Sequence, residues 1–133
     1  MGFAQFKGHK YLNLETLKKN GDGVKTPVWF AADPATDPDS AGARLYVYST
    51  ADSGKVKRIR NNPRVRIAPC TARGKLLGEW VEGRAEIVTG AEAEYGMRLL
   101  NKKYAPWKQL LDFFAMFGRN KRVVFVIRPV RGS

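Results

Sequence analysis

Six short segments of this chain are rich in apolar residues, and in most of them apolar and polar positions alternate. This period of two predicts β-strands. The Asn20–Gly23 segment after the first stretch favours a hairpin turn. Pro27 in the second stretch has no N–H to donate, so we expect that strand to lie at an edge, a bulge or a split in the sheet. The sixth stretch, residues 121–130, is apolar on both faces, so we expect other parts of the protein to cover both of its faces. The expected strands are residues 11–19, 24–31, 44–50, 64–70, 78–88 and 121–130.

The pattern changes to a helical period in three segments. Residues 53–63 predict a short basic helix, capped by Asp52 or Ser53 and stopped by Asn62-Pro63. Residues 91–104 and 106–118 predict two further helices, the second with apolar residues at the i, i+3, i+4 and i+7 spacing of a buried face. The expected fold is therefore mainly β (α+β), a six-stranded antiparallel barrel in a single domain over residues 1–133. Its short helix comes between the third and fourth strands, and its two later helices precede the last strand.

The charge of the chain is large and unevenly placed. There are 24 Lys and Arg against 12 Asp and Glu, a formal net charge of +12, and hydrophobic residues make up 44%, enough for a folded core. Residues 53–78 contain eight basic residues and no acidic one. Such segregation favours an anion-binding face over a general solubility role. A nucleic acid, a membrane surface and a phosphorylated small molecule all fit this charge.

Several kinds of chemistry are excluded by what the chain contains. A single histidine, His9, and a single cysteine, Cys70, argue against a Ser-His or Cys-His catalytic pair, a cysteine-based metal site and a disulfide framework. Gly54-Lys55 is not a P-loop, because Ser49 and Val56 stand where that motif needs glycine and a hydroxyl residue. We identify no catalytic side chain and no metal ligands. Without a signal peptide or a membrane-length apolar run, a cytoplasmic protein is expected.

The junction between the third strand and the short helix is the best candidate site. The first backbone N–H groups of a helix lack intrahelical partners and carry partial positive charge, so they can bind an anion. Ser49, Thr50 and Ser53 add hydroxyl groups there, and Lys55 adds a full charge. These features fit a phosphate. They fit an ordinary capped helix with a solvated basic face equally well.

Three sequence stretches in a fixed order resemble a known family. They are TPVWFA, LYVYSTADSGKVKRIRNNPRVRIAPC and GEWVEGRAEIV, within residues 26–88. The sequence is similar to the split β-barrel flavoproteins that include pyridoxamine 5'-phosphate oxidase, and most similar to their actinobacterial and archaeal relatives that use the deazaflavin coenzyme F420. The resemblance implies a flavin-binding split barrel.

The resemblance also implies a homodimer with the cofactor between the subunits. Lys55 and the hydroxyls of Ser49 and Thr50 would then hold the cofactor phosphate, and Lys57 and Arg58 the acidic tail of F420. The strand residues Thr26, Pro27, Val28 and Trp29 would line the ring. The residues bordering the ring or tail would be Tyr48, Cys70, Lys75, Leu76, Leu77 and Gly78.

The implied activity is hydride transfer between F420 and a small organic acceptor, such as a tetrapyrrole, a quinone or an unsaturated lactone. The accompanying proton would come from solvent, Tyr46, Tyr48 or a backbone N–H. An FMN-dependent oxidase or reductase on the same fold is the main alternative. A carrier without turnover is a second, and a nucleic-acid-binding barrel using Tyr46, Tyr48 and Trp80 is a less favoured third.

Overall fold

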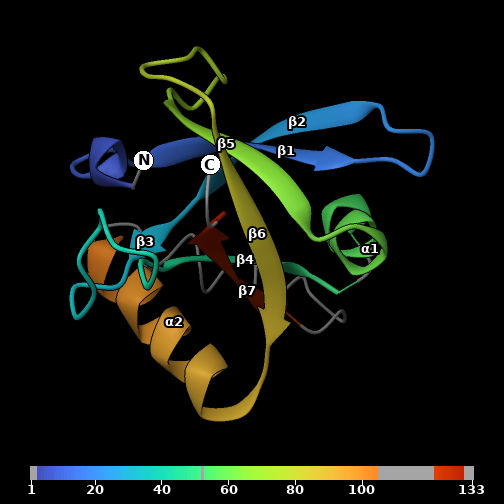
Figure 1. Cartoon of the computed structure of the whole chain (residues 1–133). Helices are drawn as coiled ribbons and strands as arrows, with labels where there is room; N and C mark the ends of the chain where they lie inside the picture. Colours follow the sequence, from blue (N-terminus) through green and yellow to red (C-terminus); the bar gives the residue numbers. More distant parts are fainter. Residues whose placement is uncertain (1–2, 52, 105–121, 131–133) are drawn as a thin grey trace.

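One antiparallel sheet, curled on itself, makes up most of the computed structural model, which describes residues 3–51, 53–104 and 122–130 (Figure 1). The hairpin turn expected at Asn20–Gly23 is confirmed, since the Lys18 N–H donates to the Asp22 carbonyl at 2.8 Å and Gly21 has a φ of 92°. In chain order the elements are η1 (Ala4–Phe6), β1 (Tyr11–Leu17), β2 (Gly23–Trp29), β3 (Ala31–Ala32), β4 (Leu45–Thr50), α1 (Gly54–Asn61), β5 (Arg64–Cys70), β6 (Val81–Val88), α2 (Gly90–Lys103) and β7 (Arg122–Pro129).

The sheet has seven strands where the sequence predicts six, because the expected strand over residues 24–31 is divided. The strand order is β2-β1-β5-β6-β7-β4-β3, and only Phe30 separates β2 from β3. The two outermost strands of the sheet are thus two halves of one continuous segment, which pairs with β1 before Phe30 and with β4 after it. This arrangement closes the barrel at a split. Pro27 lies on the edge strand β2, as expected from its missing N–H.

Tyr104, at the end of α2, stabilises the split. Its hydroxyl accepts the Phe30 N–H at 3.1 Å and lies 2.8 Å from the Phe30 carbonyl and 2.5 Å from the Lys10 carbonyl. Its ring stacks on Trp29, with 5.0 Å between the ring centroids. A side chain therefore satisfies the backbone groups that the sheet leaves unpaired at Phe30.

The two faces of the sheet bury two separate apolar clusters. The inner face of β1, β4, β5 and β7 forms the barrel core, and α1 contributes Ile59 to it. The outer face of β4 and β7 is covered by α2, which packs on Tyr46, Val124 and Val126 (Figure 1). The expectation that the last strand is covered on both faces is confirmed, because Phe125 and Ile127 belong to the first cluster and its even-numbered valines to the second.

The predicted helices and strand ends agree with the structure at most positions. α1 and α2 lie within one or two residues of the predicted helices, whereas β6 begins at Val81 instead of residue 78. The second late helix, expected over residues 106–118, lies outside the described residues. Among the described residues, no helix combines the length and the apolar character needed to cross a membrane.

Candidate functional site

The start of α1 has the cap that the sequence predicts. The Ser53 hydroxyl oxygen accepts the Val56 N–H at 3.3 Å, and the Ser49 hydroxyl donates to that same oxygen at 3.0 Å. The first turn of α1 contains no acidic residue. The N–H groups of Gly54 and Lys55 come before the first intrahelical hydrogen bond and are free to bind an anion.

Arg58 folds back over this helix start. Its Nε donates to the Thr16 hydroxyl on β1 at 2.6 Å, which ties α1 to the barrel. A Cβ atom at position 54 would lie 2.7 Å from an Arg58 terminal nitrogen, so any residue other than glycine there would displace the guanidinium. Gly54 thus leaves room for a cation directly above the first turn.

Lys55 brings a second cation to the same place. Its side chain is half-buried, and burial together with the charge of Arg58 lowers the pKa of its ammonium below the ordinary value. Across the described part of the chain, no carboxylate forms an ion pair with Lys55, Lys57 or Arg58. The helix start therefore concentrates positive charge that no described acidic side chain neutralises, and a bound anion would restore the pKa of Lys55.

The predicted ring-lining residues of β2 divide between the two faces of the sheet. Pro27 and Trp29 pair with Asn13 and Tyr11 on the outer face. Thr26 pairs with the core residue Leu14, and Val28 packs against the barrel core. A ligand on the outer face could therefore contact the side chains of Pro27 and Trp29. It could contact only the backbone atoms of Thr26 and Val28.

The loop that follows β5 folds over this outer face. The Gly74 carbonyl accepts the Asn13 side-chain amide at 3.2 Å, and the Leu77 N–H donates to the Pro69 carbonyl at 2.8 Å. The predicted residues Lys75, Leu76, Leu77 and Gly78 are all exposed in this loop. Leu76 and Leu77, 42% and 51% exposed, are the large hydrophobic side chains that the described structure leaves open to solvent.

Cys70 ends β5 beneath the same loop. It is buried, and burial raises the pKa of its thiol, so the sulfur stays protonated near neutral pH. Within the described ranges, no three His, Cys, Asp or Glu side chains gather as metal ligands would.

The predicted residues form two groups that lie apart. α1 precedes β5 and the loop of residues 71–80 follows it, so the groups lie at opposite ends of that strand (Figure 1). A strand of seven residues spans about 20 Å. The first group contains Ser49, Thr50, Lys55, Lys57 and Arg58, and the second contains Pro27, Cys70 and Lys75 to Gly78. Tyr48 and Trp29 lie between these groups, because both pack against the cluster under α2 that contains Tyr104.

Asn13 is a polar residue of the second group that the sequence reasoning missed. Its side chain is 6% exposed, and its Oδ1 has no hydrogen-bond partner within the described structure. The alternation along the first strand places Asn13 on the polar side, but only the loop folded over it makes it buried. An unpaired buried amide oxygen is a ready acceptor for a ligand N–H.

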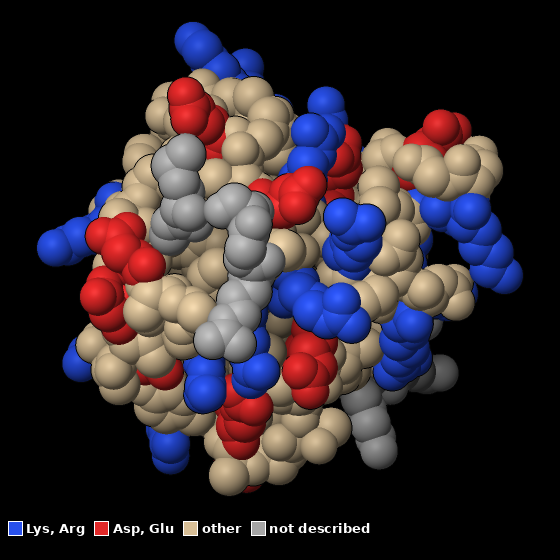
Figure 2. Space-filling model, in the orientation of Figure 1, with Lys and Arg blue, Asp and Glu red and all other residues tan. Residues whose placement is uncertain are grey.

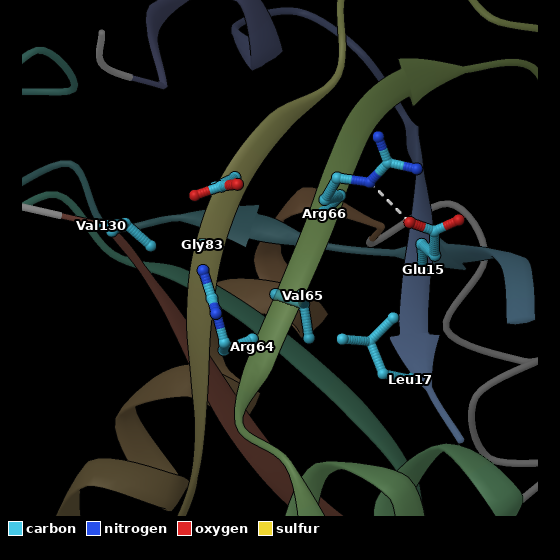
Figure 3. Close-up of a pocket in the computed structure, with 8 residues that line it drawn as sticks. Glu15, Leu17, Arg64, Val65, Arg66, Gly83 and Val130 are labelled. Carbon is cyan, nitrogen blue, oxygen red and sulfur yellow. Dashed lines mark hydrogen bonds and ion pairs between the residues drawn. The ribbon is translucent and has the colours of Figure 1, made fainter. Parts of the chain in front are cut away.

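A shallow cavity of about 200 Å³ lies elsewhere, on the outer side of β5 and β6 (Figure 3). None of the predicted site residues lines it. Glu15, only 6% exposed, accepts a hydrogen bond from Arg66 at 2.6 Å at its edge. Its lining residues are Glu15, Leu17, Arg64, Val65, Arg66, Glu82, Gly83 and Val130.

The aromatic surface expected for a nucleic-acid-binding barrel is largely absent from the described structure. Tyr46 is not an exposed aromatic as expected: it is fully buried under α2, and its hydroxyl donates to Glu92 at 3.0 Å. Lys25 and Arg66 both lie over the Trp80 ring, 5.3 and 5.4 Å from its centre. Tyr48 is half-buried and packs against the cluster under α2.

Comparisons with solved structures agree with this fold. An F420 reductase is 20% identical, with a TM-score of 0.57 over 96% of this chain and 91% of the other. A FAD-binding protein from Mesorhizobium loti is 19% identical, with a TM-score of 0.57 over 96% and 84%. HutZ, the haem storage protein of Vibrio cholerae, is 13% identical, with a TM-score of 0.66 over 97% and 87%. No curated protein matches the chain.

These three structures share the fold while their names point to different ligands, so the fold alone does not select one. The family model described as pyridoxamine 5'-phosphate oxidase matches residues 3–133, which is nearly the whole chain. With the split barrel and its α1 helix start, this match shows that the chain belongs to the pyridoxamine 5'-phosphate oxidase family of flavin-binding split barrels.

Proposed function

We propose that this protein binds the deazaflavin coenzyme F420 with its phosphate at the start of α1, and that it transfers a hydride between the cofactor and a small organic acceptor. The observation that supports this most is the pair of cations, Lys55 and Arg58, above a helix start without a described acidic partner. Backbone N–H groups, the Ser53 hydroxyl and these cations together make the donor set that a phosphate needs, while the Ser49 hydroxyl donates to Ser53.

The surplus of positive charge favours F420 over FMN. FMN offers one phosphomonoester, whereas F420 carries a phosphodiester and an oligoglutamate tail. The Thr16 hydroxyl holds Arg58 beside the helix start, and the neighbouring residue Lys57 is exposed. Arg58 and Lys57 can therefore bind anionic groups of the cofactor beyond its phosphate. The F420 reductase among the structures with this fold supports the same choice.

The protein's own residues would bind and orient the cofactor, and the cofactor would supply hydride chemistry. Tyr48 is the better placed of the two tyrosines considered as a proton source, because the Tyr46 hydroxyl is engaged by Glu92 under α2. Burial raises the pKa of Tyr48, so its hydroxyl is protonated at neutral pH but is a weaker acid than an exposed tyrosine. We assign no catalytic side chain beyond this.

We also propose a homodimer, because the cations of α1 and the loop of residues 71–80 lie at opposite ends of β5 in one chain. A partner subunit could place its loop of residues 71–80 against the α1 group of the first subunit. Leu76 and Leu77, exposed beside the outer face of β2, offer apolar surface for such a contact. Sedimentation velocity would test this, and a monomer at micromolar concentration would contradict it.

The decisive experiment for the activity is a titration of the pure protein with F420 and with FMN, followed by a screen of acceptors with the reduced cofactor. We expect F420 to bind and FMN to bind more weakly. Tight FMN binding without detectable F420 binding would instead support an FMN-dependent oxidase or reductase. F420 binding without turnover of any acceptor class would indicate a carrier.

A further inference from the structure

Four arginines lie in one row across the outer face of the sheet, three of them on neighbouring strands and the fourth just before β4. Arg64 of β5 is directly opposite Arg84 of β6, and Arg84 is directly opposite Arg128 of β7. Arg44 comes immediately before the Leu45–Ile127 pair of β4 and β7 and therefore lies beside Arg128. Neighbouring strands are about 4.8 Å apart, so this arginine row extends over about 14 Å.

The described carboxylates neutralise the arginine row only in part. Like charges directly opposite one another destabilise a sheet, and across the described chain neither Arg64 nor Arg84 forms an ion pair. Arg44 and Arg128 meet the same Glu92 oxygen at 3.6 and 3.8 Å, which is long for a charge-assisted hydrogen bond. The Nε atoms of both are buried and have no hydrogen-bond partner among the described residues.

Acidic residues border the row on both sides. Glu82 and Glu86 lie two positions to either side of Arg84 on the same face of β6, and Glu86 is 3.9 Å from Arg128. Figure 2 shows Lys and Arg side chains gathered over β5 and β6 with acidic side chains between them. A broad polyanion such as a duplex or a membrane would press its charge against these carboxylates. A narrow molecule lying across the strands would avoid them.

The cavity described above lies at the β5 end of the row, where it could bind one end of a ligand. Arg64 lines it beside Gly83 and Val130, and Leu17 and Val65 give it an apolar side (Figure 3). Glu15 and Glu82 line it as well, and Arg66 pairs with Glu15, so Arg64 is the cation that an anion would meet at its edge. We propose that the arginine row binds a linear small oligoanion, an oligophosphate or an oligocarboxylate, with one end at this cavity. The site is separate from the α1 helix start, since none of its residues belongs to that group.

The test is calorimetric titration of the full chain with tripolyphosphate and, separately, with a triglutamate peptide, which distinguish the two sources of charge. In the Arg64→Gln/Arg84→Gln variant we expect the dissociation constant of the bound probe to rise at least about tenfold, the loss of two charge-assisted contacts at exposed positions. Lys18→Gln/Lys19→Gln, which removes two exposed charges at the β1–β2 hairpin, should change little. Arg84→Lys keeps the charge but loses the planar fork and should give an intermediate value.

The double arginine variant should fold, because it removes repulsion between exposed side chains, and its melting temperature should not fall. Lys55→Ala should leave probe binding unchanged. Binding of neither probe, an equal loss in both double variants, or a loss in Lys55→Ala would overturn the proposal. So would binding of duplex oligonucleotides or anionic vesicles alone.

Discussion

The Tyr104 hydroxyl at the barrel split gives the sharpest prediction for stability. Tyr104→Phe keeps the ring and its stack on Trp29 but removes the acceptor of the Phe30 N–H. The Phe30 carbonyl keeps a second donor, the Lys103 ammonium at 2.9 Å. The Lys10 carbonyl also loses the Tyr104 hydroxyl, but Lys10 is an exposed residue, so the main loss is one buried N–H left without a partner. Such a group costs about 1–3 kcal/mol.

The expected shift in melting temperature follows from chain length. An unfolding entropy of about 2.1 cal/mol/K per residue gives about 0.28 kcal/mol/K for 133 residues. A loss of about 2 kcal/mol therefore lowers Tm by about 7 °C, measurable by calorimetry or by circular dichroism. Tyr11→Phe is the control, because no hydrogen bond is described for that half-buried hydroxyl.

A Tyr104→Phe variant with the melting temperature of the Tyr11→Phe control would refute this account of the split. It would mean that the Phe30 N–H finds another acceptor at no cost. A large loss of stability in both variants would mean that the Tyr11 hydroxyl is needed as well, and the loss in Tyr104→Phe could then not be assigned to the split.

Three further variants test other parts of the structure. Gly96→Ala should lower the free energy of unfolding, measured in urea, by about 1 kcal/mol, because the new Cβ would lie 2.6 Å from the buried Tyr46 ring. Alanine has the better helix propensity, so a gain in stability would contradict this packing. Burial against Phe30 lowers the pKa of Lys103 to about 8, although much of the side chain is exposed. Between pH 8 and 10 the folded state therefore binds fewer protons than the unfolded state. Wild-type stability should therefore rise with pH in that window relative to Lys103→Met, and parallel profiles would argue against this burial. Leu77→Asp should shift the sedimentation coefficient toward the monomer, and an unchanged dimer would place the interface elsewhere.

Local patterns predict the elements of this fold well, but long-range contacts decide how they close. The missing N–H of Pro27 indicates an edge, a bulge or a split, yet the break falls at Phe30 because Tyr104, 74 residues later, supplies the missing hydrogen bonds. The hairpin at residues 20–23 and the Ser53 cap are local features, and both are confirmed.

The candidate site divides in the same way. The local sequence is enough to place the hydroxyls and Lys55 at the start of α1. The hydrogen bond from Arg58 to Thr16 could not be predicted in this way, because it depends on how the helix packs on the barrel. The burial of Asn13 depends on a loop about 60 residues away in sequence. The arginine row depends on strand register, which alternation along single strands does not determine.

The measurement that tests the central claim most directly is the dissociation constant of F420 for the wild type and for Lys55→Ala, with Lys19→Ala as an exposed control. The account predicts that F420 binds the wild type and that Lys55→Ala weakens binding by about 1.5–3 kcal/mol, the range for a hydrogen bond to a charged group. The fold should persist, because Val56 and Ile59, not Lys55, pack α1 on the barrel. Equal affinity in all three proteins would contradict a cofactor phosphate at the start of α1.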